Sequence, residues 1–216
     1  MPSSIPHHTS DVLRIIRKYK VSSFLDVGAG FGRWGFLARE MCDVFALRYT
    51  KDSWQTRIDA VEAFPDYITP VHRYIYDNIY LESIEDFIKK HQQCYDIIFA
   101  GDVLEHIDKP VALEIIKVFL ERYNQALIVG IPLTNRWPQD DILGNPYERH
   151  RSTWYKKDFI NLGASKIKTY KVGTRWYALV VWRKTTRWKD FNQWLTKRWE
   201  SFKKKKLGFL FFKFDH

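Results

Sequence analysis

The fold of this chain is decided by residues 23–35, which read Ser-Phe-Leu-Asp-Val-Gly-Ala-Gly-Phe-Gly-Arg-Trp-Gly. A short apolar run ends in a cluster of glycines, and helix-forming residues follow at 36–40. The pattern predicts a buried strand that turns sharply into a helix. The glycines at this turn allow a ligand to approach the backbone closely. Such a turn suits a dinucleotide, another adenosine ligand or a plain tight turn, so the rest of the chain must decide.

Length and composition favour one folded domain, which we place at residues 1–184. The chain has 216 residues and is 45% hydrophobic, which supports a full core and argues against disorder. No apolar run approaches the roughly 18 residues needed to span a bilayer, and residues 1–11 lack the apolar core of a signal peptide. The two cysteines, Cys42 and Cys94, offer no metal-binding spacing. We therefore expect a reduced, cytoplasmic setting.

Strands and helices alternate along the chain. Apolar periodicity predicts helices at 11–20, 32–42, 83–91, 110–123 and 153–162. Strands are expected at 22–28, 58–64, within 74–82, and at 95–100, 126–131, 166–172 and 175–184. The last two strands flank a Gly-Thr turn and predict an antiparallel hairpin. We expect an α/β fold: a doubly wound, mostly parallel sheet with helices on both faces and a terminal antiparallel hairpin.

In such a sheet the ligand binds outside the carboxyl ends of the strands, where the strand order reverses. Residues at these ends are candidate ligand contacts by position alone. They are Asp26 to Gly30 after the first strand, Glu62 after the second, Glu82 and Ser83 after the third, and Gly101 and Asp102 after the fourth. Glu62 could accept both hydroxyls of a ribose, or it could be a solvated carboxylate at a strand end.

Three segments, in this order, resemble the successive motifs of class I S-adenosylmethionine-dependent methyltransferases. They are residues 25–32, Val61-Glu62 and residues 95–107, and the similarity covers about residues 10–184. The resemblance implies that family's Rossmann-like fold with a seven-stranded sheet, and S-adenosyl-L-methionine as cofactor. It also implies cofactor contacts: Asp26 and the backbone of Gly28, Ala29 and Gly30 at the methionine part, Glu62 at the ribose, Glu82, Ser83 and Ile84 at the adenine, with Gly101 and Asp102 beside them.

The spacing of two of these motifs departs from that pattern. Asp26 and Glu62 are 36 residues apart, whereas a bare strand–helix unit needs about 20. The surplus is residues 43–57, which contain Trp54 and several basic residues. We interpret this segment as an inserted cap beside the cleft, because loops at a binding end of a sheet carry specificity. The alternative is a surface excursion with a partly buried tryptophan.

Methyl transfer requires that the acceptor is placed in line with the methyl group and that water is excluded. A base is needed only when the acceptor must lose a proton. His106, after the fourth strand, and His150, in the polar and aromatic stretch before the helix at 153–162, are the candidate catalytic residues. Each is alternatively a structural histidine. We expect residues 148–154 to line the acceptor pocket.

A metal site is a further alternative at residues 102–106. On a helical turn Asp102, Glu105 and His106 share one face, and such donors suit a divalent cation. The turn is similar to the metal-binding turn of ubiquinone-biosynthesis O-methyltransferases, with Asp102 in place of a glutamate. The same Glu-His pair supports the fold of relatives that need no metal. Our expectation is that no metal binds there.

Residues 185–216 differ in character from the rest of the chain. Residues 187–206 carry eight basic residues against two acidic ones, which is +6 of the net charge of +10. Large apolar side chains recur there at intervals of three and four, which predicts a helix with an apolar stripe. Such a helix suits an anionic membrane surface and a peripheral location at its inner face. The alternatives are packing on its own domain, a second subunit in a homodimer, or, ranked lower, nucleic acid.

The sequence therefore predicts a methyltransferase that moves the methyl group of S-adenosyl-L-methionine to a small-molecule or glycan- or lipid-conjugated acceptor. We expect the acceptor atom to be a hydroxyl oxygen. The alternative is an RNA or protein methyltransferase that uses the basic tail to bind a polyanion.

Overall fold

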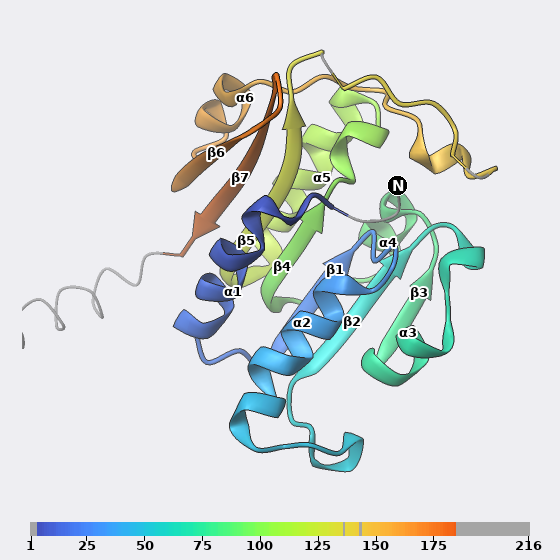
Figure 1. Cartoon of the computed structure of the whole chain (residues 1–216), viewed down its shortest axis with the longest axis vertical. Coiled ribbons are helices and arrows are strands. Elements are labelled where there is room, and N and C mark those ends of the chain that lie inside the picture. The colour runs from blue at the N-terminus through green and yellow to red at the C-terminus, as the bar shows by residue number, and fades with distance from the viewer. Residues whose placement is uncertain (1–3, 136, 143, 185–216) are drawn as a thin grey trace, which may run out of the picture. The chain divides into compact units, whose positions relative to one another are not determined.

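The computed structural model describes residues 4–135, 137–142 and 144–184. These residues form one seven-stranded sheet with helices on both faces, so the predicted α/β fold is confirmed (Figure 1). Residues 185–216, and with them the predicted tail helix and its membrane surface, lie outside the described residues.

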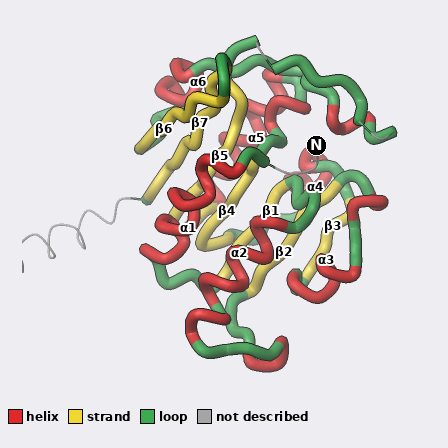
Figure 2. Tube along the Cα trace, in the orientation of Figure 1, coloured by secondary structure: helices red, strands yellow, loops and turns green. Residues whose placement is uncertain are grey.

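The sheet order is β3-β2-β1-β4-β5-β7-β6, and it reverses between β1 and β4. The strands are β1 (Ser23–Val27), β2 (Arg57–Glu62), β3 (Asn78–Leu81), β4 (Tyr95–Gly101), β5 (Tyr123–Leu133), β6 (Lys166–Val172) and β7 (Arg175–Arg183). The α-helices, separated by loops and short 3-10 turns (Figure 2), are α1 (Thr9–Lys18), α2 (Arg33–Cys42), α3 (Pro70–Ile75), α4 (Ile84–Lys90), α5 (Lys109–Arg122) and α6 (Lys156–Asn161). Strand β7 alone runs opposite to the other six strands, as the terminal hairpin predicts.

The core lies on both faces of the sheet, and β4 shows why. Every residue of β4 is buried. Its side chains alternate: Ile97 and Phe99 join the cluster that contains α1 and α2, whereas Ile98 and Ala100 join the cluster of α4 and α5. A strand covered on both faces needs apolar residues at consecutive positions rather than at every second one.

Helix α3 was missed by the sequence prediction, and the start of helix α6 was predicted too early. The short α3 was not predicted; Thr69 precedes it as N-cap and Pro70 is its first residue, a common start signal for a helix. Helix α6 begins at Lys156 rather than at 153. Trp154, placed in the helix by its periodicity, is instead a core residue that stacks on Phe159 with ring centroids 5.2 Å apart.

The interpretation of residues 43–57 as a cap beside the cleft is wrong. Helix α2 starts at the carboxyl end of β1 and runs back along the sheet, so the chain that follows it emerges at the amino ends of the strands (Figure 1). The backbone N–H of Arg57 donates to the carbonyl of Ser22, which joins the amino ends of β1 and β2. The segment is instead a surface excursion with a partly buried Trp54, which was the alternative interpretation.

This excursion is fixed by the buried side chain of Arg39, which is 1% exposed. Its guanidinium pairs with the carboxylate of Asp43 at 2.7 Å and with that of Asp77 at 2.9 Å. It also lies over the ring of Trp54, with the guanidinium carbon 4.2 Å from the ring centroid. Buried charges are stable only when paired. Arg39 therefore ties α2, the excursion and the segment before β3 together.

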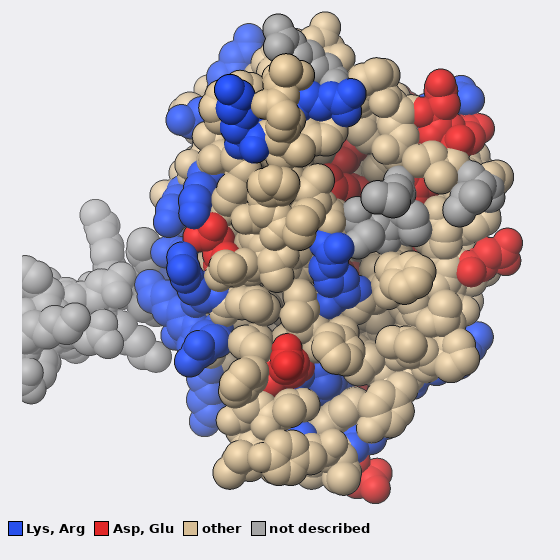
Figure 3. Space-filling model, viewed as in Figure 1, with Lys and Arg blue, Asp and Glu red and all other residues tan. Residues whose placement is uncertain are grey.

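Basic side chains gather along the side of the molecule where Figure 1 has α1 and β6 (Figure 3). Strand β6 is an edge of the sheet and carries exposed lysines at 166, 168 and 171. Lysines on an edge strand oppose pairing with another chain, so this charge has a structural explanation. No helix in the described part of the chain is long and apolar enough to cross a membrane.

Candidate functional site

A cavity opens at the carboxyl ends of the parallel strands, where the strand order reverses between β1 and β4. Its empty space, taken out to its open mouth, is about 1060 Å³. Nine of the ten predicted cofactor contacts line it: Gly28, Ala29, Gly30, Glu62, Glu82, Ser83, Ile84, Gly101 and Asp102.

The wall of the cavity at β1 is the glycine loop, which we define as residues 28–32. Gly28 has a φ of 68°, in the left-handed region that other residues avoid. A Cβ atom at this position would also lie 2.3 Å from Cγ2 of Val103. Both the backbone conformation and the space therefore require glycine here, so at this position the loop presents bare backbone to the cavity.

Glu62 joins the glycine loop to the end of β2. Its carboxylate accepts hydrogen bonds from the backbone N–H of Gly30 at 2.8 Å and from that of Phe64 at 2.9 Å. Burial raises the pKa of this carboxyl, and those two backbone donors oppose the rise. A carboxylate has about four lone-pair sites. Glu62 can thus hold the loop in place and still accept hydrogen bonds from a ligand in the cavity.

Asp26 is placed differently from the expectation that it faces the methionine part of the cofactor. It does not line the cavity and is fully buried behind the glycine loop. Its Oδ2 accepts from the backbone N–H of Gly35 at 3.0 Å and from the hydroxyl of Tyr76 at 2.5 Å. Burial raises its pKa to about 7. Asp26 therefore anchors the first turn of α2 beneath the loop.

The carbonyl of Gly30 is held by a residue that the sequence did not single out. The backbone N–H of Thr69 donates to Nδ1 of His72, so the ring proton resides on Nε2. That nitrogen lies 3.0 Å from the carbonyl oxygen of Gly30, to which it donates. His72 and Tyr76 both lie in or directly after α3. Because α3 was not predicted, the sequence offered no signal that they support the loop.

The segment after β3 contributes both charged and apolar side chains to the cavity wall. The carboxylate of Glu82 pairs with Lys90 and His91, each at 2.7 Å, and the hydrogen bond from Lys90 is the main cause that lowers its pKa. The hydroxyl of Ser83 is the N-cap of α4 and accepts from the N–H of Asp86 at 3.1 Å. Ile84 is 7% exposed and offers apolar surface to the cavity.

At the end of β4 two carboxyl groups lie close together. Asp102 has a φ of 53° and accepts a hydrogen bond from the hydroxyl of Tyr177 at 2.9 Å. Burial raises the pKa of Asp102 to about 6. Glu105 is 1% exposed. Burial, and secondarily the charge of Asp102, raise its pKa well above the usual range.

The two candidate catalytic histidines meet beside this pair. His106 lines the cavity, whereas His150 does not; its ring packs edge-on against His106, with centroids 4.8 Å apart. Burial and the neighbouring His150 lower the pKa of His106 to about 4, and burial also lowers the pKa of His150. Both imidazoles are therefore neutral at neutral pH.

The loop between β5 and α6 covers one side of the cavity and brings His150 into place. The backbone N–H groups of Arg151 and Ser152 donate to the carbonyl of Glu105, at 2.7 and 3.0 Å. Of the predicted acceptor-pocket stretch 148–154, Glu148 and Arg151 line the cavity, while Trp154 belongs to the core.

Several further residues line the cavity although the sequence did not indicate them. The hydroxyl of Tyr67 donates to Glu148 at 2.9 Å and so links the segment after β2 to the β5–α6 loop. Arg33 donates to the carbonyl of Ser4, which brings the amino-terminal segment into the wall. The further lining residues include Ser4, Arg33, Trp34, Tyr67, Asn145 and Tyr147.

No protein-family model and no curated protein sequence matches the chain. Solved structures do. TehB from Haemophilus influenzae superposes with a TM-score of 0.59 at 14% identity, over 82% of this chain and 62% of TehB. The 1,6-didemethyltoxoflavin-N1-methyltransferase of Burkholderia thailandensis, which holds S-adenosylhomocysteine, gives 0.57 at 14% identity, over 83% and 77%. The N-methyltransferase NodS from Bradyrhizobium japonicum, also with S-adenosylhomocysteine, gives 0.57 at 15% identity, over 82% and 85%.

These similarities concern the fold, because the identities are low. This chain spans about three fifths of the length of TehB. The seven-stranded sheet with its flanking helices and antiparallel terminal hairpin matches the Rossmann-like fold of the similar structures. The chain has the fold of the class I S-adenosylmethionine-dependent methyltransferases.

Proposed function

We propose that the protein is an enzyme that transfers the methyl group of S-adenosyl-L-methionine to a hydroxyl oxygen of a small or glycan- or lipid-conjugated acceptor. The observation that carries the proposal is the cavity at the reversal of strand order, which combines a bare glycine loop, the Glu62 carboxylate and the apolar start of α4. A backbone that a ligand can approach closely, a carboxylate and an apolar wall match the amino-acid, ribose and adenine parts of that cofactor in kind.

The residues present fit such a cofactor. A side chain at Gly28 would intrude on the cavity wall, so only a bare backbone borders the ligand there. Glu62 retains lone pairs for the ribose hydroxyls, and Ile84 supplies a surface for the adenine ring. When bound, S-adenosyl-L-methionine supplies an activated methyl group on a sulfonium. The protein then has to orient the acceptor and exclude water.

We assign the acceptor side of the cavity to His106, Tyr147, Glu148 and Arg151. These side chains offer hydrogen-bonding groups and one aromatic face, which suits a hydroxylated acceptor better than a purely apolar one. His106 and His150 are proposed to act on that acceptor. Since His150 does not line the cavity, its effect has to pass through His106 or through a group that both rings hold.

Replacing Glu62 by glutamine is expected to weaken the binding of S-adenosylhomocysteine by about 1.5–3 kcal/mol, or roughly 10- to 150-fold, because a charged acceptor for the ribose hydroxyls is lost. Isothermal calorimetry measures this. Glu121→Gln is the matched control, because Glu121 is exposed on α5. Undiminished affinity in a folded Glu62→Gln variant would show that Glu62 does not hold the cofactor.

The acceptor class is tested by methyl transfer from radiolabelled cofactor to separate fractions of RNA, protein, small metabolites and extracted glycolipids. Label in the metabolite or glycolipid fraction supports the proposal. The second candidate is an RNA or protein methyltransferase, favoured by the +6 charge that residues 187–206 carry. Label confined to RNA or protein supports this second candidate and contradicts methyl transfer to a small or conjugated acceptor.

A further inference from the structure

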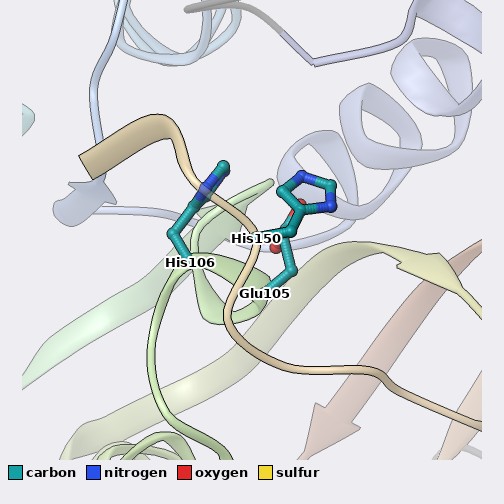
Figure 4. Close-up of side chains that lie close together, drawn as sticks. All are labelled: Glu105, His106 and His150. Carbon is teal, nitrogen blue, oxygen red and sulfur yellow. The ribbon is translucent and has the colours of Figure 1, made fainter. Parts of the chain in front are cut away.

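Glu105, His106 and His150 form a cluster at the wall of the cavity, where the turn after β4 meets the β5–α6 loop (Figure 4). One donor atom from each residue can be chosen such that all three lie within 4.8 Å of one another. We propose that this cluster binds one divalent transition-metal ion. This ligand set is not the one that the sequence offered, since Asp102 is bonded to Tyr177 and His150 takes its place.

The first support is the state of the Glu105 side chain. It is 1% exposed, its two oxygens make no hydrogen bond of good geometry among the described residues, and a second acid, Asp102, adjoins it. A buried carboxylate that adjoins a second acid and has no paired cation is unfavourable by several kcal/mol. The two imidazoles that adjoin it bring no positive charge of their own when neutral. A cation between the three side chains would satisfy the carboxylate.

The second support is the orientation of His106. Its Nδ1 lies 3.3 Å from the carbonyl oxygen of Arg149. A carbonyl only accepts, so this contact places the ring proton on Nδ1 and leaves the lone pair on Nε2 free for an ion. Metal-binding histidines commonly donate their other N–H to a backbone carbonyl in this way.

The third support is the backbone that carries the ligands. Arg151 and Ser152 donate to the carbonyl of Glu105, and the N–H of His150 donates to the carbonyl of Gln139 at 3.0 Å. The two ligand-bearing segments are thus hydrogen-bonded to each other. Metal–ligand bonds of about 2.0–2.2 Å place tetrahedral donors roughly 3.5 Å apart. Small rotations of the side chains suffice to bring the donor atoms, now within 4.8 Å of one another, to this separation.

The donor set indicates the class of ion. Imidazoles suit zinc, iron, nickel and copper, and a single carboxylate is compatible with zinc, iron or manganese. Three protein ligands leave a coordination position open, and His106 borders the cavity. An ion there would polarise an acceptor hydroxyl. Only this role rests on the proposed methyl transfer; binding of the ion does not.

The test is titration of Co²⁺ into the full-length protein after removal of metals by a chelator, followed by visible absorption and calorimetry. We expect one Co²⁺ per chain with the absorption of a low-coordinate nitrogen and oxygen site. His106→Asn, His150→Asn and Glu105→Gln should each weaken binding about tenfold or more. His7→Asn should not, since His7 is exposed and lies outside the cluster. Unchanged affinity in the cluster variants overturns the proposal.

If the variants do not fold, the wild-type protein decides. Proton spectra of the Co²⁺-loaded protein should contain two strongly shifted imidazole N–H signals, one from each ligand histidine, which persist in His7→Asn. Their absence overturns the proposal. Calorimetry with S-adenosylhomocysteine in the presence of chelator separates this result from the cofactor assignment, which predicts binding without any metal.

Discussion

Valine at position 28 is expected to reduce the affinity for S-adenosylhomocysteine by roughly 30-fold to several thousandfold. The left-handed φ of Gly28 costs a residue with a side chain about 1–2 kcal/mol. The clash of its Cβ with Val103, at 2.3 Å, adds about 1–3 kcal/mol of overpacking. In the variant, the loop moves to relieve this strain. Part of the binding free energy of the cofactor is then used to return the loop to its place, so the affinity falls.

Gly173→Ala is the matched control for this effect. Gly173 also has a positive φ, 59°, but no atom lies within 4 Å of a Cβ built there, and it sits in the turn between β6 and β7. The control should lose about 1–2 kcal/mol of unfolding free energy and keep its affinity for S-adenosylhomocysteine. In Gly28→Ala, adding Val103→Ala should restore part of the affinity. Equal affinity of Gly28→Val and the wild type in calorimetry would refute the role of the glycine loop.

His106→Ala and His150→Ala are each expected to lower turnover about 10²- to 10⁴-fold, the range seen when a group that handles a proton is removed. The affinity for S-adenosylhomocysteine should change little, because neither ring belongs to the predicted cofactor contacts. The measurement is single-turnover methyl transfer to the acceptor fraction that takes up label, beside calorimetry of the same variants. The exposed His7→Ala is the control.

Chelation separates two ways in which these histidines could act. If they hold an ion that polarises the acceptor, removal of metal lowers turnover as much as either substitution does. If His106 contacts the acceptor directly and His150 acts through it, chelation leaves turnover unchanged. A loss smaller than tenfold in both variants would mean that positioning alone drives the reaction, and that the two residues are wrongly assigned.

Most of the sheet and most of the cavity wall followed from local sequence. The run from Phe24 to Gly32 and the apolar residues 97–100 of β4 carry their own signals. A strand buried on both faces and a turn with positive φ each demand particular residues. Topology then places the ends of β1, β2 and β4 beside one another. The candidate contacts at those ends could therefore be named without coordinates.

The parts that could not be predicted depend on contacts between distant segments. The bond of His72 to Gly30 and that of Tyr67 to Glu148 join residues 42 and 81 positions apart. No local pattern encodes such pairs. The placement of residues 43–57 is a different case. A segment between a helix and the next parallel strand must lie at the amino ends of the strands, so topology alone already argued against a cap.

The buried ion pairs of Arg39 have a consequence for how the chain can accept insertions. The entropy of closing a flexible loop grows only logarithmically, by about 0.6 kcal/mol for each doubling of its length. The extra residues of 43–57 begin and end at the amino ends of the strands, and the first of them, Asp43, is held by Arg39. They therefore lengthen the chain between Asp26 and Glu62 without moving either residue. Insertions at the amino ends of the strands therefore leave the cavity at the carboxyl ends unchanged.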